Sequence, residues 1–192
     1  MSSGQGEADA LRAMLAQNRV VRTLLERAPQ LQLPNWYLGA GCIAQTIWNV
    51  LCDFPPEQHI RDYDLVYFDD SDLSEQAEAD VYRRLRVLTG DLRIQGDVKN
   101  QARVHLWYEA HFGYPIRPYR SVEEAIASWP TTATAVGIRS LEPDGALYAP
   151  FGLGDLLAMV VRPNKRQITE AVYLDKVRRW TTRWPRLTVV AW

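Results

Sequence analysis

The sequence predicts a single domain of the α/β (α+β) class, on three observations. An aromatic segment typical of a short strand runs into Gly39-Ala40-Gly41, and the apolar residues 43–51 after this turn are typical of a buried helix. An apolar and aromatic run at 63–68 predicts the next strand. Apolar residues recur at helical spacing near both ends of the chain, which predicts amphipathic helices over 7–27 and 168–184.

Cap and turn residues place the remaining elements. Ser71 or Asp72 can cap a helix over 73–88, because Ser and Asp side chains accept hydrogen bonds from the free amides of a first helical turn. Gly90 follows that helix, and the alternating residues 92–98 then predict a third strand. Helices are also expected over 100–110, after Ser121 and between 150 and 161, and outer strands over 131–139 and 146–149.

Length and composition allow one hydrophobic core. The chain has 192 residues, of which 47% are hydrophobic and 23% are charged. We therefore expect one domain over 1–192, with a C-terminal helical part over 150–192. Residues 1–6 are rich in Ser and Gly and are expected to be disordered.

The charge of the chain is balanced overall but uneven along its length. A formal net charge of -1 argues against a protein that coats nucleic acid by neutralising phosphates. Residues 53–80 carry ten acidic residues against Arg61 alone, whereas residues 156–192 carry eight basic residues against Glu170 and Asp175. The basic C-terminal part either steers an anionic acceptor or only balances the acidic middle of the chain.

Cysteine usage and hydropathy predict a cytoplasmic protein without a membrane partner. Cys42 and Cys52 are the two thiols, and both are expected to be small core residues in a reducing compartment. The chain opens without a basic and apolar leader, and its apolar runs stay well below the roughly 20 residues that a membrane-spanning helix needs.

The pair Asp62 and Asp64 is the strongest indication of chemistry. Residues at i and i+2 of a strand point to the same face about 6.5 Å apart, so both carboxylates are expected at one place on the sheet. An Asp-x-Asp pair alone is more often a solvated strand end than a ligand pair. Here it opens a strand of buried residue types, where two unpaired carboxylates repel each other and a cation relieves the repulsion. Oxygen ligands without Cys or His favour Mg²⁺, with Mn²⁺ as the other possible metal.

The glycine turn before this strand is the second indication. Gly39, Ala40 and Gly41 stand between a strand end and a helix start, where glycines let backbone amides approach a phosphate and the helix N-terminus favours negative charge. Two glycines alone also suit any tight turn. The sequence after the turn is neither a dinucleotide-binding fingerprint nor a Walker loop, because it has no third glycine and no Gly-Lys-Ser or Gly-Lys-Thr.

The third expected strand supplies further candidates. Asp97 is an acid between small or apolar neighbours, and a third carboxylate would allow two metals to be held close together. Lys99, Asn100 and Arg103 follow it, and the last two would share a helical face. These three residues could meet a triphosphate or an acceptor, or they could belong to a solvated helix whose cations reach into water.

In this order of motifs the chain resembles the nucleotidyltransferase superfamily that includes DNA polymerase beta. More closely, it resembles the bacterial group described as nucleotidyltransferase family protein, over roughly residues 10 to 186. The segments that carry the resemblance are 39–48, 62–69, 98–105, 129–136 and 149–153.

The resemblance implies a nucleotidyltransferase fold, a small mixed β-sheet flanked by helices, with the N- and C-terminal helices packed on it. It implies that Gly39 and Gly41 lie near nucleotide phosphates, that Asp62 and Asp64 bind Mg²⁺, and that Asp97 is the third acid that helps to activate the acceptor hydroxyl. Two features depart from the superfamily pattern: the stretch from Gly41 to Asp62 is long, and Cys42 replaces the common Ser after the turn.

The leading hypothesis is therefore a Mg²⁺-dependent enzyme that moves a nucleoside monophosphate from a nucleoside triphosphate to a hydroxyl or phosphate acceptor. The acceptor is a small molecule, an RNA end or a protein. A second hypothesis is a nucleotide-binding or toxin-neutralising interaction protein that keeps the fold without turnover. A third is a glycosyltransferase that holds a sugar nucleotide with Asp-x-Asp, for which 192 residues is short and the glycine turn has no role.

Overall fold

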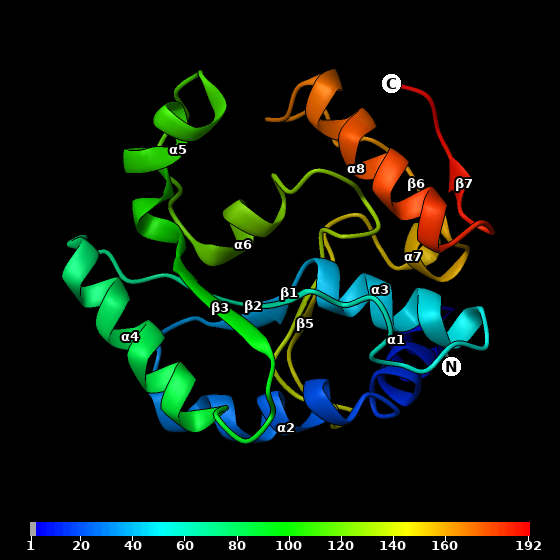
Figure 1. Cartoon of the computed structure of the whole chain (residues 1–192), viewed down its shortest axis with the longest axis horizontal. Coiled ribbons are helices and arrows are strands. Elements are labelled where there is room, and N and C mark those ends of the chain that lie inside the picture. The colour runs from blue at the N-terminus through cyan, green and yellow to red at the C-terminus, as the bar shows by residue number, and fades with distance from the viewer. Residues whose placement is uncertain (1–2) are drawn as a thin grey trace.

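A five-stranded mixed β-sheet lies at the centre of the computed structural model, which describes residues 3–192 (Figure 1). The strand order is β3-β2-β1-β4-β5. Strands β2 and β3 are parallel and the other neighbours are antiparallel. The strands are β1 (Tyr37–Gly39), β2 (Asp62–Tyr67), β3 (Gln95–Asn100), β4 (Gly137–Ile138) and β5 (Leu147–Tyr148). The predicted class, a small mixed sheet flanked by helices, is confirmed.

Helices surround this sheet on both faces, and a second sheet of two short parallel strands lies near the C-terminus. The helices are α1 (Ser3–Leu15), α2 (Arg19–Arg27), α3 (Gly41–Leu51), α4 (Glu75–Leu88), α5 (Val104–Phe112), α6 (Val122–Ile126), α7 (Gly154–Leu157) and α8 (Glu170–Arg183), with 3-10 turns η1 (Ala28–Leu31) and η2 (Gln101–Arg103). The small second sheet pairs β6 (Val160–Val161) with β7 (Thr188–Val189). No helix within residues 3–192 combines the length and apolarity needed to cross a membrane.

The alternation of residues along β2 separates the two faces of the main sheet. Tyr63, Leu65 and Tyr67 are buried in the main core, together with residues of α1, α2, α3 and α4. Val66 points the other way and packs in a smaller cluster with Ile126 of α6. Asp62 and Asp64 share the face of Val66, so the sheet presents its carboxylates on the side where α6 packs.

The N-terminal helix is divided, where one helix over 7–27 was expected. The first part ends at Leu15, and Asn18 caps the second: its Oδ1 accepts a hydrogen bond from the Val21 amide at 3.0 Å, and its Nδ2 donates to Thr46 Oγ1 at 2.8 Å. The fully buried Asn18 thereby ties this junction to α3. Residues 3–6, expected to be disordered, form the first turn of α1, while residues 1 and 2 lie outside the described part of the chain.

Two other expectations shift for local reasons. The expected strand over 131–139 is reduced to β4, because Thr131 begins a turn: the amides of Thr134 and Ala135 donate to its carbonyl, at 3.2 Å and 3.0 Å. The helix expected from residue 73 begins at Glu75, because Ser74 supplies the cap. The threonine side chains that suggested an extended strand form turn contacts instead: Thr131 Oγ1 bonds the hydroxyl and the amide of Thr134.

Helix α8 is fixed on α3 by an aromatic cluster. The indole of Trp48 lies 5.4 Å from that of Trp180 and 5.5 Å from that of Trp184, measured between ring centroids, in edge-on geometry. Trp184 Nε1 also donates to Asn49 Oδ1 at 2.8 Å. This packing holds the basic face of α8 beside the start of α3, where the glycine turn lies.

Candidate active site

The register of three strands aligns the residues that the sequence singled out. Gly39 pairs with Asp64 across the antiparallel β1 and β2, and Asp64 pairs with Asp97 across the parallel β2 and β3. Paired residues of neighbouring strands point to the same face of a sheet. Asp62, two residues before Asp64, faces the same side. The predicted turn and all three predicted acids therefore lie in one region of one sheet face.

The turn between β1 and α3 is built differently from the expectation. Ala40 has φ 58° and ψ −130°, whereas positive φ among glycines occurs only at Gly113 and Gly152 in residues 3–192. A residue with a Cβ in this region stores backbone strain, and such strain is concentrated at functional sites. The strained residue is thus Ala40, and the glycines on either side serve other purposes.

Gly39 provides space for Trp129. A Cβ on Gly39 would lie 2.8 Å from a ring carbon of Trp129 and 2.8 Å from the carbonyl oxygen of Val136, so no larger residue fits. A Cβ on Gly41 would meet the side-chain amide of Gln45 at 2.8 Å, and that flexible side chain can move. Ala40 and Gly41 line the cavity described next, while Gly39 does not. The predicted approach of Gly39 to phosphates therefore stays a prediction, and the cavity itself offers Ala40 and Gly41 at this turn.

A cavity of about 290 Å³ opens beside the turn and the two aspartates of β2. Its acidic lining residues are Asp62 and Asp64, and its basic ones are Arg61, Lys99, Lys176, Arg179 and Arg183. We call it the carboxylate cavity. The acids come from β2, whereas three of the cations come from α8, so the cavity is formed where the C-terminal helix faces the sheet.

The carboxylate of Asp64 is held without an ion-pair partner. Burial raises its pKa to about 6, and the nearby charges of Asp97 and Asp62 add to this shift, while Lys176 and Lys99 oppose it in part. Neither Asp62 nor Asp64 forms an ion pair with any residue from 3 to 192. The repulsion inferred from the sequence is therefore present, and a bound cation would relieve it.

Asp97 occupies a different position from the other two acids. Its Oδ1 accepts a hydrogen bond from the Val98 amide at 2.9 Å and lies 3.5 Å from Lys99 Nζ. It lines a polar groove of about 540 Å³ along the free edge of β3, which we call the edge groove. Lys99 lines both the edge groove and the carboxylate cavity. The register thus brings Asp97 beside Asp64, but its carboxylate faces the neighbouring groove.

The donor set suits a hydrated magnesium ion better than an all-protein metal cage. Within the described residues, no group of three or more His, Cys, Asp or Glu side chains is arranged to hold a metal ion. Mg²⁺ usually keeps several waters and is bound by one or two carboxylates together with substrate phosphates. Asp62 and Asp64, unpaired and adjacent to a cationic wall, fit that manner of binding.

The cavity includes Lys176, which the sequence marked only as part of the basic C-terminal region, and Gln45, which the sequence patterns did not single out. Lys176 of α8 lies close enough to Asp64 to affect its pKa, and burial lowers the pKa of Lys176 itself, with Arg179 adding to the shift. Gln45 of α3 lines the cavity, and its Oε1 is buried without a hydrogen-bond partner within residues 3–192. The spacing of residues 176, 179 and 183 on one helical face was a usable signal, and Gln45 stands one turn after Gly41.

Asn100 and Arg103 make structural contacts outside the carboxylate cavity, and their role in nucleotide binding stays a prediction. Asn100 is buried, its Oδ1 accepts from the amides of Asp69 and Ala102, and its Nδ2 donates to the Asp69 carbonyl at 2.7 Å. The guanidinium of Arg103 is buried in an ion pair with Glu78 at 2.9 Å. Neither residue lines the carboxylate cavity. Among Lys99, Asn100 and Arg103, Lys99 alone lines the carboxylate cavity.

A strand, turn and helix beside a row of aspartates on a mixed sheet define the class of nucleotidyl-transfer domains. The family model described as Nucleotidyltransferase matches residues 26–189, and the chain belongs to this family. The resemblance seen in the sequence is confirmed, and the chain is a nucleotidyltransferase.

Solved structures extend this result. The chain is similar to a protein whose NMR structure is described as a CCA-adding enzyme head domain, with 27% identity, a TM-score of 0.76 and coverage of 95% of both chains. It also matches a CCA-adding enzyme in complex with ATP at 16% identity and a TM-score of 0.45, covering 88% of this chain and 38% of that one. No curated protein matches the sequence. Family and fold together support transfer of a nucleoside monophosphate group in general.

Proposed function

We propose that this nucleotidyltransferase moves a nucleoside monophosphate from a nucleoside triphosphate to a hydroxyl or phosphate acceptor, with Mg²⁺ held by Asp62 and Asp64. The observation that carries the proposal is that these two carboxylates have no ion-pair partner within residues 3–192, in a cavity whose other charged lining residues are all cations. A metal with its bound triphosphate satisfies both sets of charges at once.

The cations and the turn are the groups that hold the triphosphate in this proposal. Lys176 and Arg179 face the carboxylates from α8. The first amides of α3 have no partner inside their helix, and they begin at Gly41 in the wall of the cavity. These groups neutralise the phosphate oxygens and orient the α-phosphorus toward the aspartates.

The reaction then needs few covalent steps. The acceptor oxygen attacks the α-phosphorus, the bond from this phosphorus to the α,β-bridging oxygen breaks, and pyrophosphate leaves. Asp62 and Asp64 would hold the metal, which would supply a lowered pKa for the attacking hydroxyl and a stabilised charge on the phosphates. Asp97 is placed to accept the proton of an acceptor that enters along the edge groove. The register of Asp97 with Asp64 supports this role for Asp97.

The test combines a binding measurement with a turnover measurement. Isothermal titration with α,β-methylene analogues of ATP, CTP, GTP and UTP, with and without Mg²⁺, is expected to show metal-dependent binding that the Asp62→Asn, Asp64→Asn variant loses. Pyrophosphate release is expected to disappear in the same variant. Asp70→Asn, an exposed acid after β2 that does not line the cavity, is the matched control.

Two results would contradict parts of this proposal. A folded Asp62→Asn, Asp64→Asn protein with unchanged Mg²⁺-dependent binding and turnover removes the site assignment. Metal-dependent binding without pyrophosphate release, across hydroxyl and phosphate acceptors, favours the non-catalytic nucleotide-binding alternative.

A further inference from the structure

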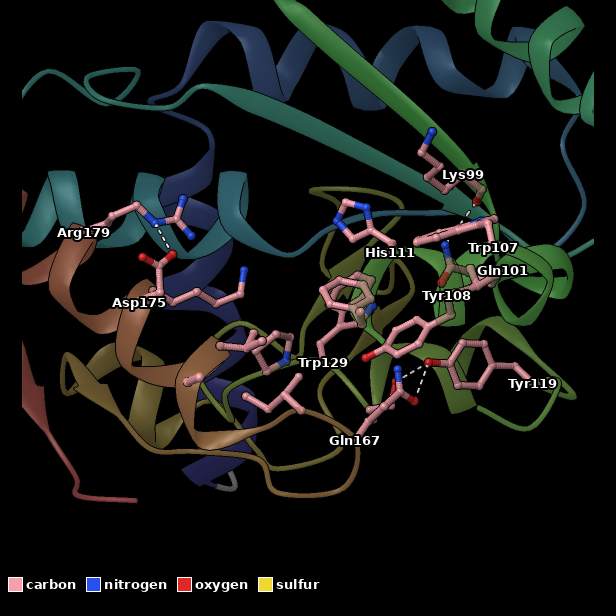
Figure 2. Close-up of a pocket in the computed structure, with 18 residues that line it drawn as sticks. Lys99, Gln101, Trp107, Tyr108, His111, Tyr119, Trp129, Gln167, Asp175 and Arg179 are labelled. Atoms are coloured by element: carbon pink, nitrogen blue, oxygen red, sulfur yellow. Dashed lines mark hydrogen bonds and ion pairs between the residues drawn. The ribbon is translucent and has the colours of Figure 1, made fainter. Parts of the chain in front are cut away.

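A second and larger cavity adjoins the carboxylate cavity on the side away from the glycine turn. Its volume is about 740 Å³, and it lies between α5, the segment leading into α6, and α8 (Figure 2). We call it the aromatic cavity. It shares Lys99, Trp129, Pro130, Lys176 and Arg179 with the carboxylate cavity, so one continuous hollow runs from Asp64 to α5.

The walls of the aromatic cavity offer flat apolar surfaces. Helix α5 contributes Trp107, Tyr108, His111 and Phe112 to the lining. Tyr119, from the segment before α6, lies beside Tyr108 (Figure 2). Ring centroids of Tyr108 and Phe112 are 4.4 Å apart, and the Trp107 and His111 rings meet edge to face at 6.2 Å. Aromatic side chains held in this way are stacking surfaces for planar heterocycles.

A few fixed polar groups interrupt these surfaces. The Tyr119 hydroxyl donates to Gln167 Oε1 at 2.8 Å, and the Tyr114 hydroxyl donates to the Gln167 backbone carbonyl at 2.7 Å. The bond from Tyr119 holds Oε1 of Gln167, and the bond from Tyr114 holds its backbone, so the Gln167 side chain is anchored at the wall of the cavity. An amide held like this can read the edge of a nucleobase by a hydrogen bond.

Size and charge divide a nucleoside triphosphate between the two cavities. Sites for whole small molecules generally measure about 300–1,000 Å³. The carboxylate cavity, at 290 Å³ and rich in cations, is at the lower limit of this range and suits the polyphosphate alone. The aromatic cavity, at 740 Å³, has room for the nucleoside. Three cations, Lys99, Lys176 and Arg179, stand where the two join, next to the expected position of the α-phosphate.

We propose that the aromatic cavity receives the nucleobase of the donor nucleoside triphosphate, stacked on the α5 aromatic wall and read by Gln167. This inference rests on the proposed function, because the phosphates of the same molecule must lie in the carboxylate cavity. It assigns the base-specificity residues to α5 and to the segment before α8.

The position of Asp97 assigns the acceptor to a different path. Asp97 faces the polar edge groove beside Glu75, Glu78 and Gln95, outside the aromatic cavity. An acceptor that gives its proton to Asp97 therefore enters through the edge groove, and the donor base occupies the remaining hollow. Lys99 lines all three spaces and stands at their junction.

The experiment compares a ligand that has a base with one that lacks it. Isothermal titration in Mg²⁺ measures the affinities of the four α,β-methylene nucleoside triphosphates and of inorganic tripolyphosphate. The wild type is expected to bind at least one analogue about tenfold or more tightly than tripolyphosphate, because a stacked base adds to the phosphate contacts. The Trp107→Ala variant is expected to bind that analogue about tenfold more weakly and to bind tripolyphosphate with unchanged affinity.

Two further variants separate stacking from folding and from base reading. Leu106→Ala changes an exposed residue of the same helix that does not line the cavity, and it is expected to bind both ligands as the wild type does. Gln167→Leu is expected to narrow the differences in affinity among the four bases. Retained tripolyphosphate binding shows that each variant is folded at the carboxylate cavity.

Each contrary result has a definite meaning. Equal affinity of the wild type for tripolyphosphate and for all four analogues overturns the assignment, as does a Trp107→Ala variant that weakens both ligands or neither. A free nucleoside can also bind in a way that the Trp107→Ala variant loses but that the triphosphate analogues do not compete with. This result places the acceptor in the aromatic cavity and overturns the assignment of the donor base to it. The Asp62→Asn, Asp64→Asn variant distinguishes failure of the proposed function from failure of the base assignment. If this variant keeps metal-dependent binding of the analogues, the result contradicts the proposed function and leaves the base assignment to the aromatic cavity standing.

Discussion

Asp64 lies directly opposite Asp97 in the parallel register of β2 and β3, with Asp62 on the same face two residues before it. Burial and these two neighbouring carboxylates raise the pKa of Asp64 to about 6. Without a metal, the arrangement is a cost to folding, because an ionised carboxylate must be kept in a partly buried place next to like charges. The same arrangement favours binding of a cation and its polyphosphate.

The first prediction concerns stability against pH in metal-free buffer. Asp64 has a pKa of about 6 in the folded chain and 3.8 as its reference value, so the unfolded chain loses its proton first as the pH rises. The cost of Asp64 is therefore absent below about pH 4, grows between pH 4 and 6, and is complete above pH 6. Asp64→Asn is expected to raise the free energy of unfolding at pH 8 by about 1–3 kcal/mol, and to have little effect at pH 4.

Urea unfolding across this pH range measures the effect. Asp70→Asn, at an exposed position, is the control and is expected to show no comparable dependence. An Asp64→Asn gain that is the same at pH 4 and pH 8 would contradict the assigned origin of the cost.

The second prediction separates the two glycines of the turn. Gly39→Ala is expected to lower the free energy of unfolding by about 1–3 kcal/mol, because its Cβ would meet both Trp129 and the Val136 carbonyl at 2.8 Å. Gly41→Ala meets only the Gln45 side chain and replaces glycine in the first turn of α3, so its stability is expected to be equal or slightly higher. Thermal and urea unfolding of both variants provide the comparison. Equal losses in the two would mean that the turn needs glycine for its backbone conformation at both positions.

The sequence predicts how the aspartates and the glycine turn are arranged better than it predicts the residues around them. The aspartate pair and the glycine turn were predicted because their spacing along one strand and at one helix start is local information. The positive φ of Ala40 was missed because the strain depends on how β1 and α3 meet, which no propensity of alanine signals. Asn100 was assigned to nucleotide binding although it bonds Asp69, 31 positions earlier in the chain.

Long-range pairing also explains the other differences. Lys176 lies near the aspartates on a helix whose Trp180, with Trp184 just after it, packs on Trp48 of α3, a contact between distant parts of the chain. The threonine-rich segment before β4 has strand propensity, yet the Thr131 turn prevails. Propensity and spacing therefore predicted the elements, whereas tertiary contacts decided which polar residues face the cavity.

The third prediction is that Arg103 stabilises the fold and does not bind nucleotide. Its side chain is 8% exposed and pairs with Glu78, which is 12% exposed. Arg103→Met is expected to lower the free energy of unfolding by about 3 kcal/mol, since it leaves a buried Glu78 carboxylate without its partner. The double variant Arg103→Met, Glu78→Met is expected to recover part of this loss. Urea unfolding measures both, and titration with tripolyphosphate in Mg²⁺ should show the wild-type affinity. A selective loss of affinity in the folded variant would return Arg103 to the nucleotide site.

The fourth prediction assigns Lys176 a binding role that is separate from stability. Burial lowers the pKa of Lys176, so its charge is disfavoured by folding at neutral pH, and the nearby Arg179 adds to this. Lys176→Met is therefore expected to unfold at the same or a higher urea concentration than the wild type. Its affinity for tripolyphosphate in Mg²⁺ is expected to fall about tenfold, because a charge-assisted contact to phosphate is lost.

Arg178→Met is the matched control for this change, because Arg178 is an exposed cation on the same helix that lines neither cavity. It is expected to change the affinity by less than about twofold, since exposed charges contribute little. Titration calorimetry and urea unfolding on the two variants separate the alternatives. Equal losses of affinity would show that the helix attracts phosphate through its overall charge, whereas a loss confined to Lys176→Met places the phosphate chain between α8 and Asp64.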